Sequence, residues 1–443
     1  MSEEFKQEKA SLFALIQSGN TDNVDIAIQI MKGNQPLHNA FVQEAYTIIE
    51  KSWRSATVKA VLRAAKDTPA AQKMLKKRYA SLLSLVSKLS YKNTLETLTS
   101  FVSAFQSYNL YKCYDWKPTT VDIQIMATIP VKALNFHERG LATLPNWIGY
   151  LSQLETIILS KNVLKVLPDT ICNLTKLEQL DVQENKLETL PKEIGQLKVL
   201  RTLELRKNNF QILPDSIGEL QNLEELSLEY NQLRSIPISI GQIRGLIKLD
   251  ISDNHLTQLP EEIGAFSNLI ELDARNNQLQ SLPSSLQQLT KLQILWLSNN
   301  QLTDLPDWVS QLRKLKKLHL SNNQLQKLPL VITNLSNLQR LYLHNNQLST
   351  LPENIGQLSR LNYLDLDENN VQFLPESIGD LLALREMRLF SNPIEKLPTR
   401  LVELPEFKEI GLGETPIGRQ YGIEVVRGRK EVLTLLRQVS VTI

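Results

Sequence analysis

The sequence is poor in several residue types that mark particular classes of protein. Only two of its 443 residues are cysteine, so a disulfide framework is excluded and a reducing compartment is expected. Basic and acidic side chains nearly cancel, with 49 Lys+Arg against 47 Asp+Glu and a formal net charge of +2. Because so small a net charge produces a weak field, it does not favour nucleic acid or an anionic membrane as the partner.

Long apolar runs are also lacking. No stretch of about 18 consecutive apolar residues, the length that a membrane-spanning helix needs, occurs in the chain. The first residues carry charges of both signs with no apolar segment behind them, so we expect no secretory signal. We therefore expect a cytoplasmic protein, and export by a route without such a signal stays an alternative.

Leucine, in contrast, is abundant, and its positions repeat. Aromatic residues make up only 6% of the chain, whereas leucine is its most frequent residue. Twelve prolines recur every 23 residues with no insertion or deletion, at positions 145, 168, 191, 214, 237, 260, 283, 306, 329, 352, 375 and 398. An asparagine stands six residues before eleven of them, from Asn162 to Asn392, and Arg139 takes this place in the first unit. Such a period indicates a solenoid of stacked units.

Each part of the unit has a physical reason. Alternating residues such as Leu318-His319-Leu320 predict a short strand that turns its leucines to one side and the residue between them to the other. The asparagine side chain has both a donor and an acceptor, so it can satisfy buried backbone groups at the turn after the strand. A 23-residue unit cannot enclose a core alone, but stacked units close one continuous apolar column.

The repeated unit, for example from Leu177 to Leu197, resembles the 23-residue leucine-rich repeat of Ras-pathway scaffold proteins, plant intracellular Ras-group repeat proteins and many bacterial repeat proteins. The resemblance covers about residues 131–398. It implies an arc-shaped solenoid of the α/β class, with a parallel sheet on a concave side that usually binds another protein. Some relatives carry a GTPase, kinase or ubiquitin-ligase domain as well.

The segments on either side of the repeats differ from them in composition. Residues 1–125 contain apolar residues at spacings of three and four and few prolines, which predicts an all-α domain of five or six helices. Residues 126–412 are expected to form the solenoid of about twelve units, and residues 413–443 a C-terminal cap with a short helix near 427–438. A cap is needed because an open solenoid end exposes core leucines.

No motif for catalysis is present. The chain has no phosphate-binding GxxxxGK[ST] loop, no GxSxG, no HExxH and no set of kinase motifs, whose geometries these chemistries need. Cys172 takes the place where most units have glycine, such as Gly195 and Gly218, and is interpreted as a small structural residue. We expect no catalytic residue, no cofactor and no enzyme activity.

The residues that the repeat leaves free on the concave face fall into two zones. Large amphipathic aromatic residues are enriched in interface hot spots. Partner-binding residues are predicted in an acidic zone, moderated by Arg206 and Arg275, that contains Asp181, Glu204, Glu229, Asp250 and Asp273. An aromatic zone is predicted from Trp296, His319, Tyr342, His344, Tyr363 and Phe390.

Two readings of one smaller group stay open. His319, His344 and Asp367 belong to three successive strands and are close enough for a metal site to be considered. A pH-sensitive contact between a histidine and an aspartate at an interface is the other reading, and it is favoured. We expect no metal site.

The function that these patterns favour is a non-catalytic scaffold or adaptor that binds a protein on its concave face. By resemblance alone, the partner is a small GTPase or another signalling protein, and we expect a monomer that binds no nucleic acid. The main alternative is a bacterial secreted effector or host-interaction factor that uses the same surface. Enzyme activity in the helical domain is a third and weaker hypothesis.

Overall fold

The computed structural model describes residues 131–440. The predicted helical domain, residues 1–125, lies outside the described residues. Ala133–Leu144 and the residues from Leu154 onward form one compact unit, and Pro145–Gln153 group with a different one.

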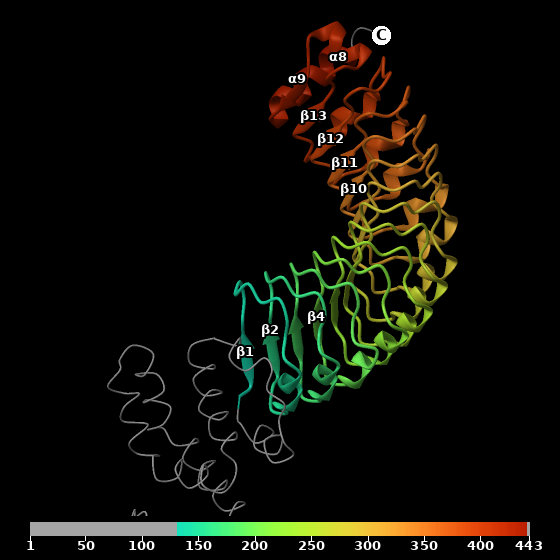
Figure 1. The fold of residues 1–443 in the computed structure, drawn as a ribbon. Coiled ribbons are helices and arrows are strands. Elements are labelled where there is room, and N and C mark those ends of the chain that lie inside the picture. Colours follow the sequence, from blue (N-terminus) through green and yellow to red (C-terminus); the bar gives the residue numbers. More distant parts are fainter. Residues whose placement is uncertain (1–130, 441–443) are drawn as a thin grey trace, which may run out of the picture. The chain divides into compact units, whose positions relative to one another are not determined.

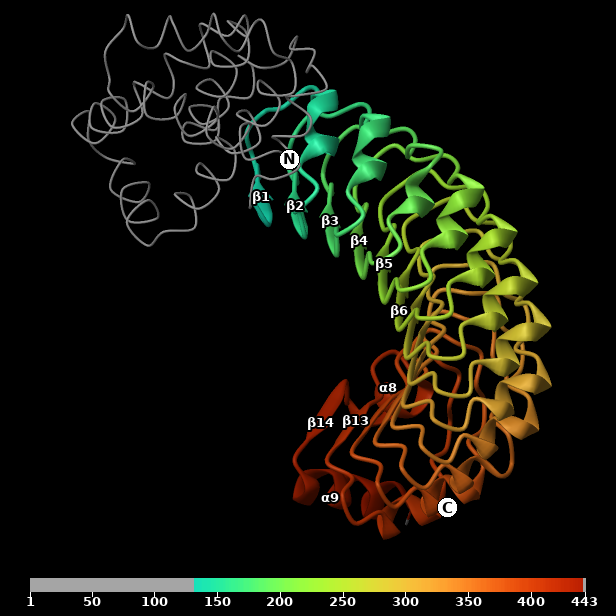
Figure 2. The same cartoon turned by 90° about the horizontal axis from the view of Figure 1, so that it is seen from below.

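A single sheet runs through all the repeats. Its first thirteen strands are parallel and lie side by side in sequence order, and partners in neighbouring strands are 23 residues apart, as Leu318, Leu341 and Leu364 show. The strands follow the inner side of a curve and the 3-10 helices follow its outer side (Figures 1 and 2). The predicted parallel solenoid is confirmed for the described residues.

The elements are short and evenly spaced. The strands are β1 (Ala133–Asn135), β2 (Thr156–Ile158), β3 (Gln179–Asp181), β4 (Thr202–Glu204), β5 (Glu225–Ser227), β6 (Lys248–Asp250), β7 (Glu271–Asp273), β8 (Ile294–Trp296), β9 (Lys317–His319), β10 (Arg340–Tyr342), β11 (Tyr363–Asp365), β12 (Glu386–Arg388), β13 (Glu409–Gly411) and β14 (Val425–Arg427). The 3-10 helices are η2 (Asn146–Tyr150), η3 (Asp169–Asn173), η4 (Ile194–Gln196), η5 (Asp215–Glu219), η6 (Ile238–Gln242), η7 (Glu261–Ala265), η8 (Ser284–Gln288), η9 (Asp307–Gln311), η10 (Leu330–Asn334), η11 (Ile355–Gln357), η12 (Glu376–Asp380) and η13 (Thr399–Glu403). Two α-helices, α8 (Pro416–Tyr421) and α9 (Arg429–Ser440), follow.

The core is a column of aliphatic side chains between the sheet and the 3-10 helices. The middle residue of a strand, such as Leu318 or Leu341, is fully buried, and so is the isoleucine of a typical 3-10 helix, such as Ile217. Cys172 is buried in η3, and burial raises the pKa of its thiol to about 11. This agrees with the structural role predicted for it.

The regular spacing of asparagine is explained by a repeated set of hydrogen bonds to the backbone. The Nδ2 of Asn300 donates to the carbonyl oxygens of Ala274 and Leu297, each at 3.0 Å. Its Oδ1 accepts from the backbone N–H of Leu279 at 3.0 Å. Ala274 and Leu279 belong to the preceding unit, so each asparagine joins two units. The predicted satisfaction of buried backbone groups by these side chains is confirmed.

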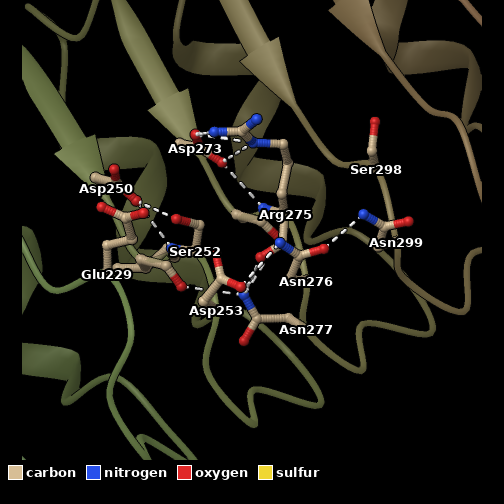
Figure 3. A network of polar contacts seen from close by, with 12 residues as sticks. Glu229, Asp250, Ser252, Asp253, Asp273, Arg275, Asn276, Asn277, Ser298 and Asn299 are labelled. Atoms are coloured by element: carbon tan, nitrogen blue, oxygen red, sulfur yellow. Dashed lines mark hydrogen bonds and ion pairs between the residues drawn. The ribbon is translucent and has the colours of Figure 1, made fainter. Parts of the chain in front are cut away.

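A second column of polar residues was not predicted. One non-glycine residue in every unit, 23 residues apart, has a positive φ angle near 50–60°. Asparagine and aspartate tolerate this left-handed conformation better than most residues, and they fill the column from Asp253 to Asn345. Some of them also bond to each other, since Asn276 Nδ2 donates to Asp253 Oδ1 at 2.9 Å (Figure 3).

The C-terminal cap contains more elements than the sequence indicated. The predicted closing helix is confirmed as α9, which packs against β13, β14 and η13. Helix α8 begins after Thr415, whose side chain accepts a hydrogen bond from the Gly418 N–H, and β14 pairs with β13 in antiparallel orientation. Neither element was predicted, because each is short and occurs once, outside the 23-residue repeat that revealed the other strands. Among residues 131–440, no helix is long and apolar enough to cross a membrane.

Candidate functional site: the inner face of the sheet

One column of side chains follows the inner face in strand register and is called here the central column. Its members are the third residues of strands β3 to β12, namely Asp181, Glu204, Ser227, Asp250, Asp273, Trp296, His319, Tyr342, Asp365 and Arg388. Neighbouring strands lie about 4.8 Å apart, so successive members are close enough to interact. The column changes from acidic to aromatic between Asp273 and Trp296.

The acidic half consists of Asp181, Glu204, Asp250 and Asp273 of the central column together with Glu229 of the adjacent column. Burial raises the pKa of Glu204, and the hydrogen bond from Ser227 opposes that effect. Burial is also the largest cause of the raised pKa of Glu229, followed by the charge of Asp250. These carboxylates are thus partly desolvated and near one another, an arrangement that a basic partner would stabilise.

An ion pair links the acidic half to the first aromatic ring. Asp273 is only 5% exposed, and burial raises its pKa although its hydrogen bond to Arg275 lowers it. Arg275 donates from Nε to both carboxylate oxygens at 3.0 Å and from Nη2 to Oδ2 at 2.6 Å (Figure 3). The same guanidinium lies over Trp296, with Cζ 4.4 Å from the ring centroid.

Four rings then form a continuous stack, called here the aromatic stack: Trp296, His319, Tyr342 and Tyr363. The centroids of Trp296 and His319 are 3.7 Å apart with an interplanar angle of 19°. Those of His319 and Tyr342 are 4.0 Å apart at 12°, and Tyr363 follows at 4.8 Å and 39°. The ring faces therefore cover one another, and the inner face presents ring edges.

The stack gives the aromatic residues a role in packing that was not predicted from the sequence. His319 is only 9% exposed, and Trp296, Tyr342 and Tyr363 are half-buried. Stacked rings contribute about 0.5–1.5 kcal/mol per pair, so these residues also stabilise the sheet. Burial is the main reason why the pKa of His319 falls to about 3, which leaves its imidazole neutral. Burial also raises the pKa of Tyr363.

The other two members of the predicted aromatic zone lie outside the stack. His344 Nδ1 is 3.3 Å from Asp365 Oδ2, and Phe390 lies against Gly411 and Gly413, where a side chain would collide with its ring. The aromatic stack therefore contains four of the six residues predicted in the aromatic zone.

The three residues of the metal alternative do not converge on one site. His319 stacks between two rings, His344 faces Asp365, and Asp367 accepts a hydrogen bond from the backbone N–H of Phe390. No group of three or more His, Cys, Asp or Glu side chains suitable for a metal occurs within residues 131–440. A histidine–aspartate contact does exist, but it joins His344 to Asp365. Burial and the nearby Asp365 charge raise the pKa of Asp367 to about 6.

Two cationic residues beside the stack were missed from the sequence. Lys317 and Arg340 are the first residues of β9 and β10 and pair in register. Arg340 Nη1 donates to the Tyr342 hydroxyl at 3.3 Å. They could have been found from the sequence, because the residues directly before and directly after the middle leucine of a strand face the same side of the sheet.

The comparisons with known proteins identify the family. A family model described as leucine-rich repeat region matches residues 239–320 and 307–412, and a second model, described as leucine rich repeat, matches residues 175–233 and 198–256. Together they cover more than half of the chain, which belongs to the leucine-rich repeat proteins. Proteins of this kind are generally non-catalytic and commonly serve as protein-interaction scaffolds. A search of curated proteins finds no match.

Solved structures of leucine-rich repeat proteins are similar to this chain. A leucine-rich repeat protein of Leptospira interrogans is 32% identical over 72% of this chain and 97% of its own, with a TM-score of 0.48. The Arabidopsis receptor kinase HAESA, solved with the peptide hormone IDA and the co-receptor SERK1, is 29% identical over 62% of this chain and 48% of its own (TM-score 0.54). The internalin InlF of Listeria monocytogenes is 23% identical over 64% and 87% (TM-score 0.51) and shares the fold.

Proposed function

We propose that this protein is a non-catalytic scaffold that binds a partner protein on the inner face of its sheet. The observation that carries the proposal is the inner face of the sheet, where the acidic half of the central column is joined through Arg275 to the aromatic stack. A basic segment of the partner contacts the acidic half, and apolar or aromatic side chains contact the stack. Charge complementarity then sets the rate of encounter, and the aromatic contacts supply most of the affinity.

The comparisons support the mode of binding and not the identity of the partner. HAESA was solved in complex with a peptide hormone and a co-receptor, which is consistent with a repeat array as a binding surface. A small GTPase or another signalling protein stays the partner expected from the resemblance to Ras-pathway scaffolds. A cytoplasmic monomer is part of the same proposal, and a secretion assay separates it from the alternative of an exported effector.

The acidic half is tested by removing charge without changing shape. We expect Glu204→Gln combined with Asp250→Asn to weaken binding of a partner recovered by affinity purification about tenfold at low salt, because two unit charges that attract a basic segment are lost. Most of the change should be in the association rate, and the salt dependence of binding should decrease. Surface plasmon resonance at several ionic strengths measures both quantities.

The matched control removes the same charge elsewhere. Glu188 and Glu353 are exposed and lie outside the strands, so Glu188→Gln with Glu353→Gln should leave the affinity almost unchanged. Equal losses in the two double variants, or no loss in the first, would show that the acidic half is not the contact surface.

A further inference from the structure

Charged residues on the inner face are mostly paired with an opposite charge. Three ion pairs are formed there: Arg206 Nε with Glu229 Oε2 at 2.8 Å, Arg275 Nη2 with Asp273 Oδ2 at 2.6 Å, and Arg388 Nε with Glu386 Oε1 at 2.8 Å. Lys248 stands in register between Glu225 and Glu271 on the neighbouring strands. The isolated sheet therefore neutralises most of the cations that it carries.

Lys317 and Arg340 are the exception. They are register partners on adjacent strands, and their outer neighbours in the same row are Ile294 and Tyr363. Within residues 131–440, neither has a carboxylate at ion-pair distance, and Arg340 bonds instead to the Tyr342 hydroxyl. Like charges directly opposite each other destabilise a sheet, so this pair costs stability in the free protein.

The rings beside the pair add to the same electrostatic character. An aromatic ring is negative over its faces and positive at its edge. Because the rings of Trp296, His319 and Tyr342 are stacked face to face, and Arg275 covers the other face of Trp296, a partner meets the edges of these rings. The stack is thus poorly suited to bind a cation over a ring face, and its surroundings favour an anion.

We infer that Lys317 and Arg340 bind a carboxylate side chain of the partner, beside the edges of the aromatic stack. Within the sheet, a carboxylate is also the group that pairs with Arg275 and with Arg388. The inference rests on the proposed function and sharpens it, since the partner segment is then dipolar. The partner segment then places a cation on the acidic half and a carboxylate beside the aromatic stack.

The strand spacing sets the distance between the two charges. The two cations lie on β9 and β10, three strands beyond Asp250 on β6 and Asp273 on β7. Three intervals of about 4.8 Å give roughly 14 Å, which an extended chain spans in about four residues. An arginine and a glutamate about four residues apart therefore match the face.

The test uses end-blocked nine-residue peptides with glycine and serine spacers, each with one tyrosine at the same position to supply the aromatic contact that the proposed function requires. The first peptide carries an arginine and, four positions later, a glutamate, and the second carries the same two residues in reverse order. The third and fourth peptides are copies of the first and second in which glutamine replaces the glutamate. Binding to the full chain is followed by NMR through the indole N–H of Trp296. Of the two peptides that carry both arginine and glutamate, the one that binds more tightly should have an affinity about fivefold to tenfold higher than the copy in which glutamine replaces its glutamate.

Variants assign this gain to the two cations. In Lys317→Gln with Arg340→Gln, the glutamate and glutamine peptides should bind equally, with the affinity that the glutamine peptide has for the wild type. The same substitutions at Lys314 and Lys327, which are exposed and outside the strands, should preserve the gain. Lys317→Glu with Arg340→Glu should instead favour a peptide in which lysine replaces the glutamate, a gain of binding that a misfolded variant cannot give.

The outcomes separate the inference from the proposed function. If the glutamine peptides bind but glutamate adds no affinity, or if the gain persists without Lys317 and Arg340, the inference is wrong and the proposed function stands. If none of the peptides binds, both are overturned.

Discussion

Replacing Asn300 with leucine is expected to lower the free energy of unfolding by about 3 kcal/mol or more. Asn300 is only 7% exposed and bonds to Ala274, Leu279 and Leu297. Leucine has a similar size but no polar atom, so the Leu279 N–H is left buried without a partner. An unsatisfied buried group costs about 1–3 kcal/mol. The carbonyl oxygens of Ala274 and Leu297 also accept from Asn277 and Asn323, so each loses one of its two side-chain bonds. A lost hydrogen bond costs about 0.5–1.5 kcal/mol. Urea unfolding measures the total loss, and hydrogen exchange at the Leu279 amide measures the local one.

The control places leucine at the adjacent position. Gln301 is exposed, so Gln301→Leu should change stability by less than about 0.5 kcal/mol. A repeat array unfolds in segments as well as globally, so faster exchange should centre on the units that contain Leu279 and Asn300. A loss no larger than in the control would mean that the asparagine column does not hold the units together.

Replacing Trp296 with alanine is expected to weaken partner binding by about 2 kcal/mol, or roughly thirtyfold, as for a central aromatic residue of an interface. The ring edge faces the partner, and the ring itself stacks between Arg275 and His319. The loss of the stacking contacts should also lower the free energy of unfolding by about 1 kcal/mol. Isothermal titration calorimetry measures the affinity and thermal unfolding the stability.

Trp308 provides the matched control. It is half-buried in η9, on the outer side of the curve that the 3-10 helices follow (Figure 2). Trp308→Ala removes an equally large ring and should lower stability without changing affinity. If the two substitutions weaken binding to the same degree, the loss reflects general destabilisation and the aromatic stack is not part of the interface.

Periodic features were predictable from the sequence because every unit repeats the same physical requirement. Leu318 must face the core and Asn323 must bond to the backbone in the same way as their counterparts 23 residues away. The third residue of each strand was likewise placed correctly on the inner face. The short elements α8 and β14 were missed, because each occurs once and is too short for a periodic pattern to show.

Side-chain contacts on the inner face could not be read from register alone. Register places His319 between Trp296 and Tyr342, but only the rotamers decide whether the rings stack or point into solvent. The same holds for His344, which contacts Asp365 and not Asp367, and for Phe390, which lies on two glycines. Lys317 and Arg340 precede the middle leucine of their strands, and register alone does not show that they lack a carboxylate partner.

The most direct test of the account places a photo-cross-linking amino acid on each side of the repeat array. Ser227 is half-buried in the central column, and Gln288 is exposed at the end of η8 on the outer side (Figure 2). With the partner recovered by affinity purification, the account predicts a cross-link from position 227 and none from position 288. A cross-link from position 288 alone would contradict it, because the partner would then bind the outer side of the array.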